Sequence, residues 1–421
     1  MKRSERLSLF FFFLIFFYAG YGSAYSKEID VILGSGMEYS DNIFNSYLNK
    51  KSDVITTLNS QVNAYLNRLH YQLMVNSGFD YQFFWNHPGI NNLNARGSLL
   101  FKYDINSTSH LKIADNLMYA KQQTRIEEQM GVVTGRNRFI SNNFSPKINW
   151  GFTEKLSAEF SYTNELFDSK DINLYSSYMN QGGCKINYDF KNFGKEKDNV
   201  YLGYNYMRRT FRNFDDINGD DILAGNGQVI YKSYMNLRYH DYGEVEMHTT
   251  SLGGGMVFFK QLTVSPGINA QSGTKINKKN FSDLGASIKF SYSMNEMTSF
   301  SVMYEKRRDI NSFVNYVYGY NMVNISATRW LDKKTLISLI LFLSKVKYEG
   351  IRFSNLLQKY SVEISHDFTD DLKVKLAYYL EVVNSRNYGL YMSTTDIIRY
   401  KGQVDNRYLK NTVSLEITYK I

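Results

Sequence analysis

Few side chains in this sequence have the chemistry and the spacing for catalysis or metal binding. Six histidines are present: His70, His87, His110, His240, His248 and His366. None of them forms the His-Glu-x-x-His order of a zinc protease, and no serine motif accompanies them to build a nucleophile. The single cysteine, Cys184, excludes an internal disulfide and a cysteine-based metal cluster. The sequence therefore predicts a protein that is not an enzyme and that has no catalytic residue, no metal and no cofactor.

Two segments could still hold a cation. Residues 215–221 supply carboxylate and amide oxygens around a glycine, as a calcium loop does. The segment lacks the Asp-x-Asp-x-Asp/Asn-Gly order, and no Glu stands six residues after the glycine, so we expect a solvated acidic loop. His240 and His248 share a polar stretch with Glu244 and Glu246, which leaves a metal site there as an open alternative.

Charged side chains also recur at every second position of several segments. Lys373 and Lys375 alternate with Leu372, Val374 and Leu376, so the two kinds of residue lie on opposite faces of a strand. The same phase rule groups eight basic residues on the polar face: Arg96, Lys102, Lys147, Arg209, Lys289, Arg307, Lys373 and Lys375. It adds five glutamates to that face: Glu159, Glu305, Glu363, Glu381 and Glu416.

Two explanations fit this charged face. The charges can pair across neighbouring strands around water, or they can form an electropositive path for an anionic sugar polymer. Tyr201 and Tyr379 share the face, where they could stack on sugar rings or simply fill space. The whole chain carries a formal charge of +9 without a dense basic block, so we expect no nucleic-acid partner.

The elements that must position these residues are strands. Aromatic residues make up 16% of the chain and suit pleated strands, while only 3 prolines interrupt it. Apolar and polar residues alternate with period two through residues 156–163, 284–292, 372–379 and 413–420. Beyond the N-terminal segment no apolar run reaches about 18 residues, which excludes a helical membrane protein.

The predicted connections alternate between short and long. Eight short and nine long connections imply about 18 strands, with both ends of the chain on the short-turn side. The expected long connections include 211–248, 345–355 and 384–407. Residues 229–239 alternate inside the first of these. They could form a hairpin above the membrane, an internal plug or two more strands, so the count ranges from roughly 16 to 20.

This plan is that of an all-β fold, a transmembrane antiparallel β-barrel of the outer-membrane type with short periplasmic turns and longer external loops. A soluble propeller would show a repeat of about 40–50 residues, and none is found. A barrel of about 18 strands is wide enough for a water-filled channel. Trp85, Trp150 and Trp330 fall at predicted strand ends, where we expect them to anchor the barrel at the membrane interfaces.

Residues 1–24 have the features of a secretory signal peptide. Lys2, Arg3 and Arg6 precede the apolar segment 7–18, and the small residues 22–24 offer a cleavage site. We therefore expect residues 25–421 to form a single barrel domain in the cell outer membrane, surrounded by outer-membrane lipid, with 211–248 as a long external loop.

The stretch Glu38-Tyr39-Ser40-Asp41-Asn42-Ile43-Phe44 closes the first predicted strand. It resembles the opening motif of a family of outer-membrane β-barrel porins that accompany exopolysaccharide synthesis and export systems in Gram-negative bacteria. The resemblance implies a porin-like channel that serves export of an exopolysaccharide or capsule polymer. It also implies two partners, a periplasmic polysaccharide-export protein and an anionic polysaccharide. From the residues alone, Asp41-Asn42 is a good strand stop and Tyr39 suits the membrane interface.

The C-terminal segment bears on assembly. Members of that family commonly end in an aromatic residue that the barrel-assembly machinery recognises. Residues Thr418-Tyr419-Lys420-Ile421 keep the alternation but place Ile last. The alternative to a transport channel is a structural or surface-interaction barrel with a plugged lumen, which an inward-folded segment 211–248 would favour. The sequence does not specify the polymer, the partner system or the oligomeric state.

Overall fold

The structure, a computed structural model, is an antiparallel β-barrel. It describes residues 27–43, 51–120, 139–169, 176–190, 198–212, 244–258, 261–274, 280–310, 317–348, 353–388 and 403–420. The expected signal peptide (1–24) lies outside the described residues, as do residues 213–243, which include the acidic segment 215–221 and the alternating segment 229–239.

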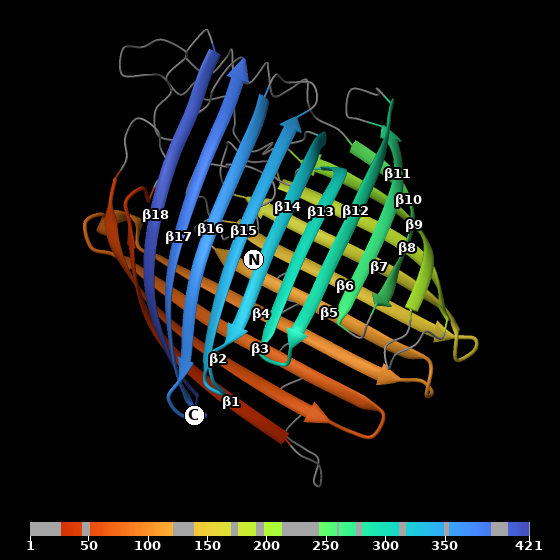
Figure 1. Cartoon of the computed structure of the whole chain (residues 1–421), viewed down its shortest axis with the longest axis horizontal. Helices are drawn as coiled ribbons and strands as arrows, with labels where there is room; N and C mark the ends of the chain where they lie inside the picture. The colour runs from red at the N-terminus through yellow and green to blue at the C-terminus, as the bar shows by residue number, and fades with distance from the viewer. Residues whose placement is uncertain are drawn as a thin grey trace.

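Eighteen strands follow one another in chain order around the barrel (Figure 1). The strands are β1 (Lys27–Ser40), β2 (Asp53–Asn67), β3 (Tyr71–Phe84), β4 (Asn92–Asp104), β5 (His110–Ala120), β6 (Phe139–Gly151), β7 (Leu156–Ser169), β8 (Ser176–Phe190), β9 (Asp198–Arg212), β10 (Glu244–Phe258), β11 (Leu262–Thr274), β12 (Asn280–Asn295), β13 (Thr298–Ile310), β14 (Val317–Trp330), β15 (Thr335–Tyr348), β16 (Phe353–Asp367), β17 (Leu372–Tyr388) and β18 (Gln403–Lys420). A short 3-10 helix, η1 (Pro88–Ile90), lies between β3 and β4.

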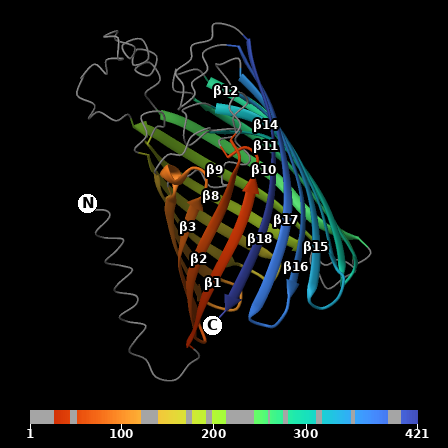
Figure 2. The ribbon, with the colours of Figure 1, turned by 90° about the vertical axis from the view of Figure 1, so that its left-hand side faces the viewer.

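Each strand pairs antiparallel with its neighbours in the sequence, and β1 pairs with β18 to close the sheet. Figure 2 shows β1 and β18 side by side, with the start of β1 and the end of β18 at the same end of the barrel. The short turns gather at that end, which the general rule for such barrels identifies as periplasmic. The predicted all-β barrel of about 18 strands is confirmed.

The strands extend further toward the long loops than the sequence predicts. The expected connection 345–355 shrinks to 349–352, and residues 384–388 and 403–407 belong to β17 and β18. Within 211–248, the first two residues complete β9 and the last five begin β10. At the end of β15 the outward-facing residues change from Leu339, Leu341 and Leu343 to Lys345 and Lys347, so the apolar outer face ends there although the backbone ladder continues.

The outer surface of the barrel is apolar. Large apolar side chains point outward from the middle of the strands, for example Leu284 (72% exposed), Ile268 (60%) and Leu202. A surface of this kind is stable only when lipid covers it, and a closed sheet leaves no unpaired backbone edge in the hydrocarbon. The protein is therefore a membrane-spanning barrel of the cell outer membrane. Among the described residues, no helix is long and apolar enough to cross a membrane.

An acidic residue of β5 interrupts the lipid-facing surface. Asp115 of β5 shares the outward phase of Leu117, and its register with β4 and β6 is unbroken, so no bulge turns it inward. The side-chain amide of Asn142 on β6 donates a 2.8 Å hydrogen bond to its carboxylate. The carboxylate on this apolar face is thus stabilised by a hydrogen bond from a polar neighbour on the same face.

Candidate functional site: the inner wall of the barrel

The predicted lumen residues lie on the inner face of the barrel, which we call the inner wall. In β17 the exposed Leu376 and Tyr378 point to lipid, so Lys373, Lys375 and Tyr379 point inward. The same alternation, carried from strand to strand by the pairing register, places the remaining predicted residues on the inner wall: Arg96, Lys102, Lys147, Tyr201, Arg209, Lys289 and Arg307.

Most of the predicted cations form ion pairs across or along the strands. The pairs, with nitrogen to oxygen distances, are Arg96–Asp80 at 3.7 Å, Lys147–Glu159 at 2.6 Å, Arg209–Glu165 at 3.2 Å, Arg307–Glu305 at 3.3 Å, Lys373–Asp367 at 3.6 Å and Lys375–Glu363 at 3.0 Å. Asp80, Glu165 and Asp367 were missing from the acidic set that the sequence predicted. The wall is therefore closer to charge balance than the sequence suggests, because partners two residues away on the same strand, or one or two strands away, supply the carboxylates.

Two of the predicted cations differ from the rest. Within the part of the chain that the structure describes, no carboxylate oxygen lies within 4.0 Å of the Lys102 or Lys289 ammonium. Sequence reasoning also missed Lys112, which lies directly across from Lys102 on the inner wall. The signal that could have found Lys112 is its alternation with Leu111 and Ile113.

The two predicted inner-wall tyrosines, Tyr201 and Tyr379, each contact a charged side chain of the protein. The Lys185 ammonium lies 4.0 Å from the centroid of the Tyr201 ring, a cation–π contact. That ring rests against Gly253, where an added Cβ would come within 2.6 Å of the Tyr201 hydroxyl. The hydroxyl of Tyr379 donates a 2.8 Å hydrogen bond to Glu363, the partner of Lys375. Stacking of a sugar on Tyr201 would require Lys185 to move.

The inner wall has two distinct halves. Near the short turns, in what we call the periplasmic half, charged side chains reach water; Lys102, Lys112 and Lys289 are all exposed. Toward the long loops, in the long-loop half, many of the inward-facing residues are apolar and buried. One cluster there contains Met179, Met207, Phe211, Val245, Met247, Phe281 and Val317, and a second contains Tyr318, Tyr320, Met322 and Val346.

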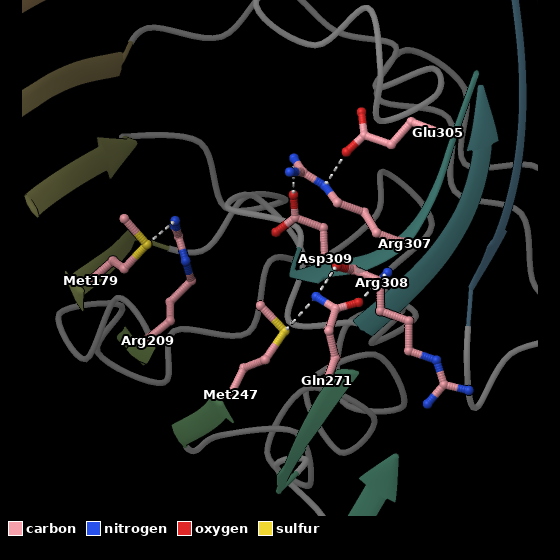
Figure 3. Close-up of polar contacts among 8 residues, drawn as sticks. All are labelled: Met179, Arg209, Met247, Gln271, Glu305, Arg307, Arg308 and Asp309. Carbon is pink, nitrogen blue, oxygen red and sulfur yellow. Dashed lines mark hydrogen bonds and ion pairs between the residues drawn. The ribbon is translucent and has the colours of Figure 1, made fainter. Parts of the chain in front are cut away.

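The polar groups of the long-loop half are held tightly, as Figure 3 shows. Arg209 is only 4% exposed, and its guanidinium contacts Glu165, the Ser177 hydroxyl at 3.0 Å and the Met179 sulfur at 3.1 Å. Gln271, also buried, donates to the Arg308 carbonyl at 3.0 Å and accepts from the Arg308 backbone N–H at 2.8 Å. These bonds offset most of the cost of burying the two polar side chains, although the Arg209 Nε has no hydrogen-bond partner among the described residues.

Part of the porin-like motif lies at the seam where the barrel closes. The Asp41 carboxylate accepts two 2.7 Å hydrogen bonds from Asn411 of β18, one from its backbone N–H and one from its side-chain amide. Tyr39 points to lipid, whereas Ser40 and Asn42 are fully buried. Glu38 and Ser40 share the inner-wall phase, Ile43 packs in a small apolar cluster, and Phe44 lies outside the described residues.

The three tryptophans all lie at strand ends but do not share one face. Trp85 is exposed at the long-loop end, where its indole N–H donates to Thr56 at 3.0 Å. Trp150 is exposed on the outer face near a periplasmic turn. Trp330 is in phase with the inward-facing Tyr320, so it lies on the inner wall. Trp330 differs because it falls on the inward-facing alternate positions of β14, whereas Trp85 and Trp150 fall on outward-facing ones. Of the three, we therefore expect only Trp85 and Trp150 to anchor the barrel at a membrane interface.

His248, Glu244 and Glu246, the described residues of the metal site that the sequence left open, bind other side chains of the protein. Glu244, Glu246 and His248 lie on the outer face of β10, where the acids face Arg208 and the imidazole Nδ1 lies 2.7 Å from the Tyr204 hydroxyl. No group of three His, Cys, Asp or Glu side chains in the described ranges could hold a metal ion. His240 lies outside these ranges.

Neither a protein-family model nor a curated protein matches this chain. Solved structures of outer-membrane receptors do. The siderophore receptor PirA from Pseudomonas aeruginosa is 8% identical over 95% of this chain and 81% of its own, with a TM-score of 0.47. The siderophore receptor PirA from Acinetobacter baumannii is 8% identical over 95% of this chain and 81% of its own, with a TM-score of 0.49. The alcaligin receptor FauA from Bordetella pertussis is 9% identical over 92% of this chain and 76% of its own, with a TM-score of 0.44. Because the identities and TM-scores are low, the closed sheet and the apolar outer surface of this chain are what place it in the outer membrane.

Proposed function

We propose that this outer-membrane barrel is a porin-like channel that serves export of an anionic exopolysaccharide or capsule polymer. The observation that carries the proposal is the periplasmic half of the inner wall, where lysines and carboxylates line a space open to water. An 18-stranded barrel is of the size that encloses an aqueous channel. A periplasmic polysaccharide-export protein would deliver the polymer to this end of the barrel.

The paired charges suit a moving cargo better than a permanent ligand. A polymer carboxylate can take the place of Glu363 on Lys375 or of Asp367 on Lys373, and the protein carboxylate can then displace it. Conduction requires sites that bind strongly enough to admit the cargo and weakly enough to release it. Ion pairs that water can reach, worth about 0–1 kcal/mol, meet that requirement.

A deletion strain tests the proposal. Surface polymer should fall in the deletion strain and return with the wild-type gene, whereas the double variant Lys373→Glu/Lys375→Glu should assemble but restore little polymer. Lys373→Gln/Lys375→Gln is the matched control for charge reversal and should restore more. Normal surface polymer in the deletion strain would refute the export role.

The buried long-loop half favours a second candidate, a structural or surface-interaction barrel without a transport role. The two functions differ in conductance. In planar bilayers the channel should conduct ions, and Lys373→Glu/Lys375→Glu should shift its selectivity toward cations. Assembled protein without conductance, before and after deletion of residues 213–243, would favour the second candidate.

A further inference from the structure

The periplasmic half of the inner wall contains one row of like charges that the channel proposal does not explain. Lys102 of β4 lies directly opposite Lys112 of β5, and Lys112 lies directly opposite Lys147 of β6. The three strands are side by side in the barrel (Figure 1), and all three side chains share the inner wall. Neighbouring strands lie about 4.8 Å apart, so the row spans roughly 10 Å.

Elsewhere on this wall, the register places opposite charges across from each other. Lys359 faces Glu381, with 3.2 Å between nitrogen and oxygen, and Lys373 faces Asp367 at 3.6 Å. Like charges in directly opposed positions destabilise a sheet. The row on β4–β6 therefore has an electrostatic cost that the rest of the wall avoids.

Only one end of the row is neutralised. Lys147 binds Glu159 at 2.6 Å, whereas no carboxylate oxygen of the described residues lies within 4.0 Å of the Lys102 or Lys112 nitrogen. The acid closest in register is Asp104, two residues beyond Lys102 on the same face and opposite His110. The flanking positions in the row itself are neutral, with Gln72 beside Lys102 and Ser161 beside Lys147.

We infer that Lys102 and Lys112, extended by Lys147, form a binding site for a chain that carries repeated oxyanion groups. Two ammonium groups at adjacent strand positions match a ligand with two or more carboxylates about 5 Å apart better than they match a single small anion. The site lies near the β4–β5 turn, so an anionic polymer would meet it on entry from the periplasm. This inference rests on the proposed export function and names the first contact of its cargo.

Binding to the full-length barrel in detergent tests the site. Calorimetric titration with trigalacturonate, a sugar trimer with three carboxylates, should show binding to the wild type that weakens as salt is added. Lys112→Gln should lower the affinity about tenfold, the loss of one charge-assisted contact, and Lys102→Gln should act similarly. The uncharged trimer maltotriose should not bind, and monomeric galacturonate should bind far more weakly than the trimer.

Lys289→Gln is the matched control. Lys289 is also an exposed inner-wall lysine without a described carboxylate partner, but its cross-strand neighbours are Ser265 and Met303. Its substitution should change the affinity by less than about twofold, because only a distant charge is lost. Equal losses in Lys289→Gln and Lys112→Gln would overturn the site in favour of a diffuse positive field. Absence of trimer binding to the wild type would overturn it as well.

Two further readouts separate this site from the proposed function. Each variant is first checked for heat-modifiable migration on gels, which reports a closed barrel. Conductance of the same preparation is then measured in planar bilayers. Conductance without trimer binding refutes the anion site and leaves the channel intact, whereas trimer binding without conductance supports the site and refutes the channel.

Discussion

The two halves of the inner wall differ in how their inward-facing side chains are stabilised: many are buried in the long-loop half, whereas those of the periplasmic half reach water. In the long-loop half, Phe211, Met247 and Tyr320 are buried among other apolar side chains, and the terminal nitrogens of the buried Arg209 bind Glu165 and the Ser177 hydroxyl. In the periplasmic half, Lys373 and Lys375 reach water and pair with single carboxylates. Stability should therefore depend on the first region, while charge and ligand effects should concentrate in the second.

The largest expected effect comes from a cavity in the long-loop half. Phe211→Ala should lower the free energy of unfolding by about 3–5 kcal/mol, because the phenyl ring is buried and its neighbours can fill the space only partly. The temperature at which the folded gel band converts to the unfolded band should fall. Lys373→Ala, in the other half, should leave that temperature nearly unchanged. Equal shifts would abolish the distinction between the halves.

The next effect comes from the two kinds of ion pair. Arg209→Met removes the partner of Glu165 in a buried setting and should cost about 3 kcal/mol, the low end for a broken buried pair because Glu165 is partly exposed. Lys375→Met removes the partner of the similarly exposed Glu363 and should cost less than about 1 kcal/mol. Unfolding in urea measures both. A larger loss for Lys375→Met would show that the periplasmic pairs are structural.

The seam gives a smaller and more local effect. Asp41→Ala removes both hydrogen bonds to Asn411 and should destabilise closure by about 1.5–3 kcal/mol, the range for bonds to a charged group. Asp41→Asn can still accept one of the two bonds and should lose roughly half as much. Heat-modifiable migration reports the change. If Asp41→Ala and the wild type convert at one temperature, the motif does not stabilise the seam.

The smallest expected effect is at the β14–β15 turn. The backbone N–H of Lys334, the Thr335 hydroxyl and the Thr335 N–H all donate to Asp332, and these bonds lower the pKa of its carboxyl. The folded pKa lies below the unfolded value of about 3.9, so this stabilisation is complete above that value and is lost as the pH falls through the folded pKa. Asp332→Asn should therefore reduce the difference in urea midpoint between pH 5 and pH 3. An undiminished difference would assign the acid sensitivity to other carboxylates.

The sequence alone determined the barrel, an approximate strand number and the face on which each mid-strand residue lies. Alternation with period two carries that information, because neighbouring strand residues such as Lys373 and Val374 must point to opposite faces. It also sufficed to order the short and long connections. It failed at the strand ends near the long loops, where polar residues such as Lys345 and Lys347 replace the apolar outer face, so the limits of β15–β18 came from the backbone ladder.

Only the tertiary structure decided which residues meet across strands. The pairing register brings Asp41 to Asn411 across 370 positions of sequence, and it brings Lys102, Lys112 and Lys147 into one row. It also supplied the carboxylates that neutralise most of the predicted cations. Register depends on the turns and on the closure of the whole sheet, and a shift of a strand by a single residue would reverse every face. Local alternation fixes the face of a residue, whereas its partner is fixed only when the barrel closes.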